Sequence, residues 1–363
     1  MAISKPPAAD EIEICVFGPG TGETILIHCT GNEWICVDCT TSEGKCWPLS
    51  YLGQIGVQPD AVRLIVATHW HSDHVKGLSE LVRVCGRAQL VCSGAIRSDE
   101  FKMIVARFSS EEVGVSRAPL SEVKHCFELL AARKGNPSYK PPNFAHADQT
   151  LDRFTVGSRT VEVFALSPSP QDRLDALEAF AKYFVPVDEP ATGLSPIDQN
   201  HASVVLSIRI DDEYLLLGAD LERTNSQHTG WNAIVASTIR PQALSTLFKV
   251  PHHGSSNAQS DDVWRLMLIP SACAVVTPYA ASQLPRPEGL QWLTARTSEA
   301  YATSLATGTR IRRRPEVERI MKESTADYSS QKLPEELGMV RFRKRVGSTD
   351  SWTAETFGDG QKL

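Results

Sequence analysis

The residues best suited to chemistry in this sequence are concentrated between positions 69 and 74. Three imidazoles and one carboxylate fall within these six positions, those of His69, His71, Asp73 and His74. Imidazole and carboxylate together suit Zn²⁺, Mn²⁺ or Fe. In an extended chain His69 and His71 share one face, because side chains alternate along a strand. Asp73 and His74 then follow on a turn, where they can serve a second ion about 3.5–4 Å from the first.

The elements that must position this cluster are apolar strands that end in ligands. An apolar run at 64–66 predicts a buried strand over 61–68 that ends at the cluster. Asp220 follows a second apolar run, and His253 follows a third, with Gly254 permitting a tight turn. Three strand ends that deliver such ligands are what a two-metal hydrolytic site requires, in which a carboxylate bridges the ions and water is activated as hydroxide.

Composition indicates an ordinary globular protein. The chain has 363 residues, is 42% hydrophobic and 22% charged, and carries a net charge of −6, which argues against nonspecific coating of nucleic acid. It contains no apolar run of about 18 residues and no signal-peptide core at its start, so we expect no membrane span and a cytoplasmic location. Nine scattered cysteines fit a reducing compartment. Cys36 and Cys39 have the spacing of a redox or zinc pair, but no second pair accompanies them.

The chain is expected to form a single domain over 1–363. An antiparallel meander opens a first half at about 11–165, a second β-rich half covers about 200–300, and a C-terminal extension covers about 301–363. Two such halves, stacked sheet to sheet, fit the order of elements. The other expected features are helices at 75–85 and 99–113, a surface loop at 134–150, a linker at 185–200 and a mostly helical stretch at 231–247. Basic runs at 310–314 and 341–345 are expected to form either solvated faces or a phosphate-facing patch.

Several motifs together resemble the metallo-β-lactamase superfamily, and its branch typified by the nuclease-like domain of the DNA-uptake channel protein ComEC. Beside the His69–His74 cluster, the matching segments are G-T-G-E-T at 20–24, N-H-A-S at 200–203, L-G-A-D at 217–220 and K-V-P-H-H-G-S at 249–255. Glu23 stands in place of the branch's Asp, and Ala219 in place of its Gly. The resemblance implies an α+β fold, a four-layer αββα sandwich of two βα halves.

The resemblance also implies roles for individual residues. His69 and His71 would bind the first ion, Asp73 and His74 the second, with Asp220 as the bridge and His253 as the last ligand. His201 either completes the first ion's ligands or is a loop residue. Asp73 and Asp220 are the expected catalytic carboxylates. Residues expected to support the ligands or to contact substrate are Asp38, Asn200, Lys249, His252 and Ser255.

We therefore expect a metal-dependent hydrolase with two Zn²⁺ sites, or with Mn²⁺ or Mg²⁺ in their place. The expected substrate is a phosphodiester in nucleic acid. One alternative is a hydrolase of a small ester, lactone, thioester or amide, since the same metal core serves those reactions. Another is a metal-binding component that works only within a larger assembly, for example in phage defence. We also allow for a partner protein or a homo-oligomer under each of these hypotheses.

Overall fold

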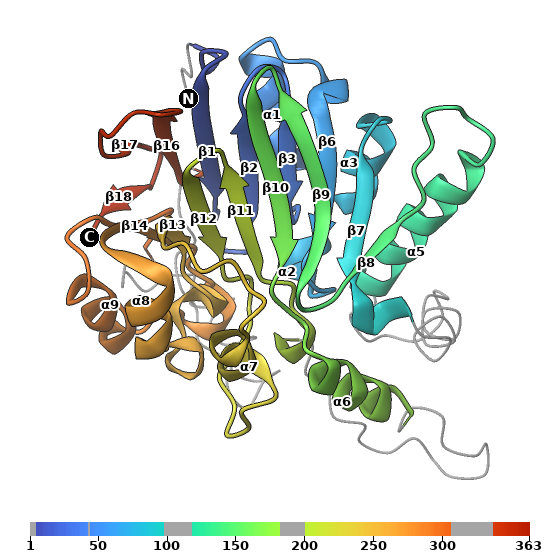
Figure 1. Cartoon of the computed structure of the whole chain (residues 1–363). Coiled ribbons are helices and arrows are strands. Elements are labelled where there is room, and N and C mark those ends of the chain that lie inside the picture. The colour runs from blue at the N-terminus through green and yellow to red at the C-terminus, as the bar shows by residue number, and fades with distance from the viewer. Residues whose placement is uncertain (1–4, 43, 98–117, 182–199, 306–336) are drawn as a thin grey trace, which may run out of the picture.

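Two eight-stranded sheets pack face to face in this protein (Figure 1). The computed structural model describes residues 5–42, 44–97, 118–181, 200–305 and 337–363. The first sheet has the order β17-β16-β1-β2-β3-β6-β7-β8. Its strands are β1 (Glu11–Phe17), β2 (Thr24–Cys29), β3 (Trp34–Val37), β6 (Val62–Ala67), β7 (Gln89–Ser93), β8 (Asn143–Ala145), β16 (Met339–Arg345) and β17 (Thr353–Phe357).

The second sheet has the order β18-β15-β14-β13-β12-β11-β10-β9. Its strands are β9 (Gln149–Val156), β10 (Arg159–Ala165), β11 (Leu206–Ile210), β12 (Glu213–Leu217), β13 (Ser245–Lys249), β14 (Leu268–Val276), β15 (Ala300–Ala302) and β18 (Gln361–Lys362). In each sheet four strands are parallel, β3-β6-β7-β8 and β12-β13-β14-β15, and the remainder pair antiparallel. A separate small hairpin joins β4 (Thr41–Ser42) to β5 (Lys45–Cys46).

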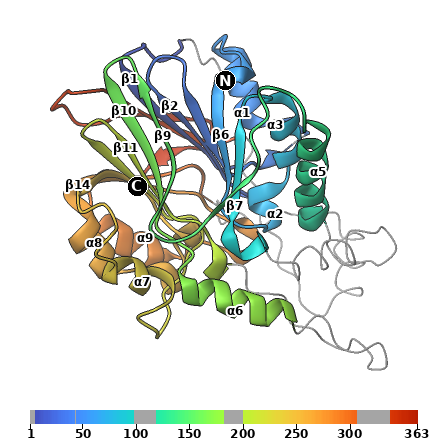
Figure 2. The same cartoon turned by 45° about the vertical axis from the view of Figure 1, so that its right-hand side comes forward.

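Helices cover the outer faces of both sheets (Figure 2). On the first sheet these are α1 (Trp47–Gln54), α3 (Leu78–Val84) and α5 (Ala118–Ala132), and on the second α7 (Gly230–Ala236), α8 (Asp261–Met267) and α9 (Pro287–Thr294). A core of fully buried aliphatic residues, such as Ile14 and Ile208, fills the space between the sheets. The four-layer helix–sheet–sheet–helix arrangement predicted from the sequence is confirmed.

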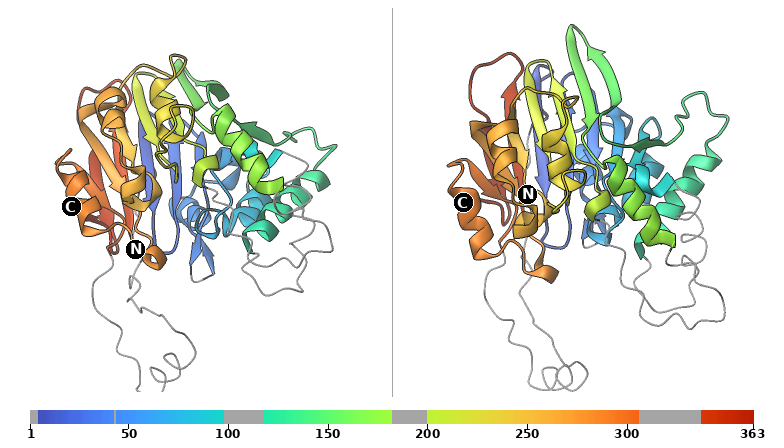
Figure 3. Two further views of the ribbon diagram at one scale, coloured as in Figure 1. Left: turned by 90° about the horizontal axis from the view of Figure 1, so that it is seen from below. Right: turned by 60° about the horizontal axis from the view of Figure 1, so that its bottom comes forward.

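Helix α6 (Pro170–Ala181) runs along the end of the sandwich where the parallel strands finish (Figures 1 and 3). Phe180 of α6 is fully buried, and the centre of its ring lies 5.6 Å from that of Trp70. Trp70 is the residue between His69 and His71 in the sequence. The helix therefore covers one side of the His-rich segment. None of the described helices is long and apolar enough to cross a membrane.

Several local expectations differ from the structure. Strands β9 and β10, expected in the first half, pair in the second sheet, and the residues expected as a C-terminal extension add strands to both sheets. The expected loop at 134–150 contains β8, and the expected helical stretch at 231–247 is helical only in α7. Residues 75–85 are not one helix, because Gly77 with φ 118° separates α2 (Ser72–Val75) from α3. The features expected at 99–113, 185–199 and 310–314 lie outside the described residues.

Candidate metal centre

The candidate site lies where the parallel strands of both sheets end, the position at which open α/β sheets commonly present functional side chains. Asp38 follows β3, and His69 follows β6 in the first sheet. Asp220 and His253 follow β12 and β13 in the second sheet. The backbone N–H of Val204 donates to the Thr68 carbonyl at 3.0 Å, which joins the two sheets beside the site.

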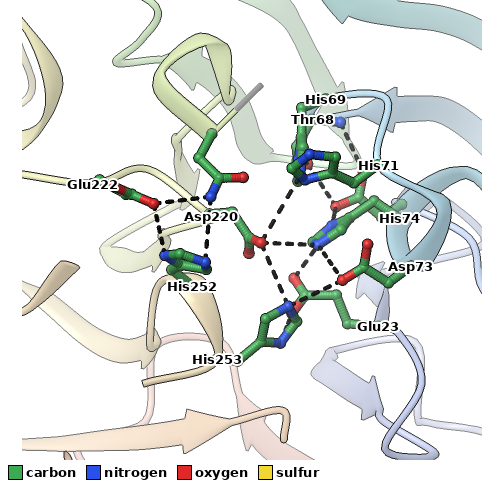
Figure 4. Close-up of polar contacts among 12 residues, drawn as sticks. Glu23, Thr68, His69, His71, Asp73, His74, Asp220, Glu222, His252 and His253 are labelled. Atoms are coloured by element: carbon green, nitrogen blue, oxygen red, sulfur yellow. Dashed lines mark hydrogen bonds and ion pairs between the residues drawn. The ribbon is translucent and has the colours of Figure 1, made fainter. Parts of the chain in front are cut away.

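The imidazoles of His74 and His253 both point toward the carboxylates of Asp73 and Asp220, and the place where they meet is called the convergence point (Figure 4). The Nε2 atom of His74 lies 3.7 Å from Asp73 Oδ2 and 3.4 Å from Asp220 Oδ2. The Nε2 atom of His253 lies 3.2 Å and 3.4 Å from the same two oxygens. Ligands about 2.1 Å from a tetrahedral Zn²⁺ are about 3.4 Å apart, so these spacings match that coordination. All four residues are buried.

A second group of donors shares Asp220 with the first. His69 Nε2 lies 3.0 Å from His71 Nδ1 and 3.9 Å from Asp220 Oδ2. The donor atoms of His69, His71 and Asp220 lie within 4.8 Å of one another, as do those of a second group, Glu23, His74, Asp220 and His253. Among the described residues Asp220 Oδ1 is buried without a hydrogen-bond partner. Asp220 thus stands between two sets of imidazoles, and a divalent cation fits either set.

Hydrogen bonds on the far side of each imidazole fix its orientation. His74 Nδ1 donates to Asp38 Oδ2 at 2.7 Å, and His253 Nδ1 donates to the Thr277 carbonyl at 2.8 Å. Since a neutral imidazole carries a single proton, both Nε2 lone pairs are directed at the convergence point. The expected supporting role of Asp38 therefore has a geometric basis, and Asp38 adopts a left-handed φ of 57° to reach its place.

Thr68 extends this pattern to His69. The Thr68 hydroxyl donates its one proton to Asp38 Oδ2 at 2.7 Å, and the Thr68 N–H donates to Asp38 Oδ1 at 2.7 Å. The same hydroxyl lies 3.0 Å from His69 Nδ1 and must therefore accept from it. His69 Nε2 is thereby left with its lone pair facing His71 and Asp220. One buried carboxylate, that of Asp38, orients two of the imidazoles.

Burial and nearby charges have opposite effects on the pKa values of the imidazoles at the site. Burial alone would lower the pKa of His253, but Asp220, Asp73 and nearby carboxylates outweigh it and raise that pKa to about 10. The pKa of His74 is held well above its usual range by the same balance. Burial and the neighbouring imidazoles hold the pKa of His69 well below its usual range. Without a metal ion, the concentrated carboxylates hold protons on His74 and His253.

Glu23 belongs to one of the two donor groups, and sequence reasoning did not single it out as a site residue. Its side chain is 1% exposed and accepts a 2.5 Å hydrogen bond from the Thr277 hydroxyl. Its oxygens lie 3.9 and 3.7 Å from the Nδ1 atoms of His74 and His253. Those nitrogens already donate to Asp38 and to the Thr277 carbonyl. Glu23 therefore lies behind these imidazoles. The G-T-G-E motif was the available signal, because a side chain at Gly22 would collide with the Asp73 carbonyl.

Lys249 is neither exposed nor placed to face a substrate phosphate, which corrects that expectation. Its side chain is fully buried, and its ammonium forms an ion pair with Glu23. The basic run at 341–345 does not form the phosphate-facing patch that was one of its two expected roles. Arg341 pairs with Glu355 at 2.7 Å, and Arg343 pairs with Glu13. These arginines belong to strand β16 and are mostly neutralised by carboxylates.

His252 points away from the convergence point and belongs to a neighbouring polar cluster. Its Nδ1 lies 3.0 Å from Glu222 Oε1, and its Nε2 lies 3.3 Å from Asn200 Nδ2. Asn200 also donates to Glu222 at 2.9 Å. His252 and His253 both have left-handed φ values, 46° and 52°, a strained arrangement that turns the two imidazoles apart. His252 and Asn200 therefore border the site without joining either donor group.

The two remaining candidates lie at the edge of this arrangement. His201 sits in the short turn Asn200–Ala202, and neither donor group includes it. Ser255 makes no side-chain capping bond to the turn Ser256–Ala258 and lines a small cavity with Trp231 and Phe248. The third imidazole expected for the first ion is therefore not supplied by these described groups.

One family model and a set of solved structures match parts of this chain. Residues 17–100, which run from the last residue of β1 past the His69–His74 cluster, match the family model of the metallo-beta-lactamase superfamily. Among solved structures, the metallo-beta-lactamase fold protein YhfI from Bacillus subtilis aligns with 12% identity over 80% of this chain and 95% of that chain, at a TM-score of 0.40. The subclass B3 metallo-beta-lactamase MEM-A1, from a soil metagenome library, aligns with 16% identity over 72% and 83%, at 0.34. No curated protein matches with significance.

Residues 17–100 are therefore similar to the metallo-beta-lactamase superfamily. Members of that superfamily are generally metal-dependent hydrolases that bind divalent metals, usually zinc. The residues present fit such ions, because imidazole nitrogens and carboxylate oxygens converge at ligand spacing.

Proposed function

We propose that this metallo-beta-lactamase superfamily domain is a hydrolase with two adjacent divalent metal sites. His69, His71 and Asp220 would hold one ion, and Asp73, His74, His253 and Asp220 the other. The observation that carries the proposal is the position of Asp220 Oδ2, which lies 3.9 Å from His69 Nε2 and 3.4 Å from the Nε2 atoms of His74 and His253. A carboxylate in that position can bridge two ions.

The protein's own residues prepare the site for hydrolysis. Divalent ions bound there would activate water near neutral pH and neutralise charge that develops on the leaving oxygen. Asp38 and the Thr277 carbonyl keep the imidazoles of His74 and His253 in the tautomer that presents Nε2. Asp73, or a residue that supports the ligands, would accept the proton. Burial of the ligands limits their competition with bulk water.

We propose a phosphodiester as the substrate. The support is the set of sequence segments that resemble the ComEC-like branch, among them the K-V-P-H-H-G-S run. Lys249 and the basic strand β16 do not support it, since their charges are used in ion pairs. A nucleic-acid substrate would have to be bound by other residues, and a partner protein or a second copy of the chain stays a prediction.

A small ester or lactone is the second candidate, and a specific observation favours it. The chain is acidic overall, with a net charge of −6, and the arginines at 341 and 343 are paired with glutamates. A polyanion gains little from such a surface, whereas a small uncharged substrate needs only the metal centre. Both candidates use the same residues at the metal sites.

The discriminating experiment compares substrates on one metal-loaded preparation. Protein loaded with Zn²⁺, Mn²⁺ or Mg²⁺ is assayed with bis(p-nitrophenyl) phosphate, single-stranded DNA, duplex DNA, RNA, p-nitrophenyl acetate and a simple lactone. We expect cleavage of the phosphodiesters, loss of at least about 100-fold in Asp220→Asn, and normal rates in Asp212→Asn, a control at an exposed turn. Cleavage of the acetate or the lactone alone would overturn the phosphodiester assignment. Folded, metal-loaded protein that cleaves none of them would overturn the hydrolase.

A further inference from the structure

Two buried cysteines lie in contact beside the metal centre. Cys39 Sγ and Cys46 Sγ are 3.6 Å apart, and the two side chains are 0% and 6% exposed. Cys39 follows Asp38, and Cys46 is the residue that precedes helix α1. All nine cysteines are free thiols and all are buried. The sequence spacing instead pointed to Cys36 and Cys39, but Cys46 makes the sulfur contact with Cys39.

The contact between these two sulfurs is close enough for a covalent bridge to need only a short movement of each. A disulfide needs about 2.05 Å between sulfur atoms, so each sulfur would move by about 0.8 Å. The β4–β5 hairpin between the cysteines has strands of only two residues each. Elements with so few backbone hydrogen bonds open locally at small cost, which gives an oxidant access. Lys45, the neighbour of Cys46 in β5, is already exposed.

We propose that Cys39 and Cys46 form a reversible disulfide when the protein meets a peroxide. The sulfur of Cys46, the less buried of the two, attacks a peroxide oxygen and breaks the O–O bond, which yields a sulfenic acid and one water. The sulfur of Cys39 then attacks the Cys46 sulfur, forms the S–S bond and releases the sulfenic oxygen as a second water. Two thiols and one hydrogen peroxide give one disulfide and two waters, and a thiol reductant reverses the change.

The bridge would act on the metal centre through the backbone. The Cys39 N–H donates to the His74 carbonyl at 2.7 Å, and the preceding residue, Asp38, accepts the proton of His74 Nδ1. The hairpin also approaches this turn closely at one point, because a side chain at Gly77 would lie 2.4 Å from the Thr41 methyl. Displacement of Cys39 would therefore move Asp38 and His74. This second step rests on the proposed metal-binding function, whereas formation of the bridge does not.

The test is to oxidise the folded, full-length chain with hydrogen peroxide and to map disulfides by peptide mass spectrometry. We expect one bridge, between Cys39 and Cys46, that dithiothreitol removes. Cys46→Ser should abolish it, whereas Cys85→Ser, which alters a nearby buried thiol, should leave it intact. A folded protein that shows no such bridge, or one in which Cys36 or Cys85 takes the place of either partner, overturns the proposal.

Metal affinity tests the coupling separately. Mn²⁺ and Zn²⁺ titrations of oxidised and reduced protein should show binding about tenfold weaker after oxidation, the scale seen when support for a ligand is lost. Oxidised Cys46→Ser should bind as its reduced form does. Equal affinity in bridged and reduced protein would overturn the coupling while the bridge itself stands. Absence of metal binding in the reduced protein would instead overturn the proposed function.

Discussion

Lys249 and Glu23 form a buried ion pair that joins the two sheets beneath the metal centre. Lys249 ends strand β13 of the second sheet, and Glu23 immediately precedes strand β2 of the first. Their side chains are 0% and 1% exposed, and the Thr277 hydroxyl donates to the same carboxylate. A buried charge is tolerated when it is paired and hydrogen-bonded, and it is destabilising when it loses its partner.

Removal of one member of this pair should destabilise the fold strongly. We expect Lys249→Met or Glu23→Gln to lower the free energy of unfolding by about 3–5 kcal/mol, because each leaves the other group buried and unpaired. The double variant Glu23→Gln with Lys249→Met should lose less than the sum of the two single losses, by about 2 kcal/mol. Urea denaturation measures all four proteins. Additive losses would show that the two side chains do not depend on each other.

Asp38→Asn should weaken metal binding while it preserves the fold. The asparagine oxygen can still accept from Thr68, but its amide nitrogen would face His74 Nδ1. That imidazole would then accept at Nδ1 and carry its proton on Nε2, which cannot bind a cation. We expect affinity for Zn²⁺ or Mn²⁺ to fall 10–100-fold by calorimetric titration. Unchanged affinity, with a circular dichroism spectrum like that of the wild type, would rule out the orienting role of Asp38.

The stability of the metal-free protein should fall as pH rises through the alkaline range. The carboxylates around His253 raise its pKa to about 10 in the folded chain, above the ordinary value of 6.5. A raised pKa means that the stabilising contribution is complete below about pH 6.5 and is lost as pH approaches 10. Unfolding in chelator between pH 7 and pH 10 should show this decline. His253→Gln should reduce the decline, with His74 retaining its share, and His228→Gln, at an exposed position, should leave it unchanged.

Metal binding should show the opposite dependence on pH. A cation can bind His74 and His253 only after their Nε2 protons leave, so affinity should rise with pH and binding should release protons. Calorimetry in buffers of different ionisation enthalpy counts those protons. A binding reaction that releases none would contradict the protonated imidazoles of the metal-free centre.

Patterns of the strands and of the His cluster predict much of this fold and site. The meander, the strand before His69 and the placement of Asp220 and His253 after apolar runs all appear in the structure. These features are local, because a short apolar run followed by polar ligands is written in consecutive residues. Pairing between distant strands is not local, and so the assignment of β9 and β10 to the second sheet could not be made.

The partners of charged residues are also hard to predict from the sequence, because they lie far apart along the chain. Whether a lysine such as Lys249 faces substrate or a buried glutamate depends on a residue more than 200 positions away. Arg341 and Arg343 likewise resemble a basic patch until their partners Glu355 and Glu13 are placed beside them. The partners of Glu23, Lys249 and Thr277, likewise lie far from it in the sequence and meet it only in the folded chain. Sequence reasoning locates the candidate ligands, and the tertiary structure decides which charges support them.

The central claim is that Asp220 serves two metal sites built from different imidazoles. Metal content after Zn²⁺ or Mn²⁺ loading and gel filtration, measured by elemental analysis, tests it most directly. We predict two equivalents for the wild type and for His252→Ala, whose imidazole lies outside both groups. His71→Ala and His253→Ala should each retain one equivalent, and Asp220→Ala should lose most of both. Two equivalents in Asp220→Ala, or no metal in the folded wild-type protein, would contradict the account.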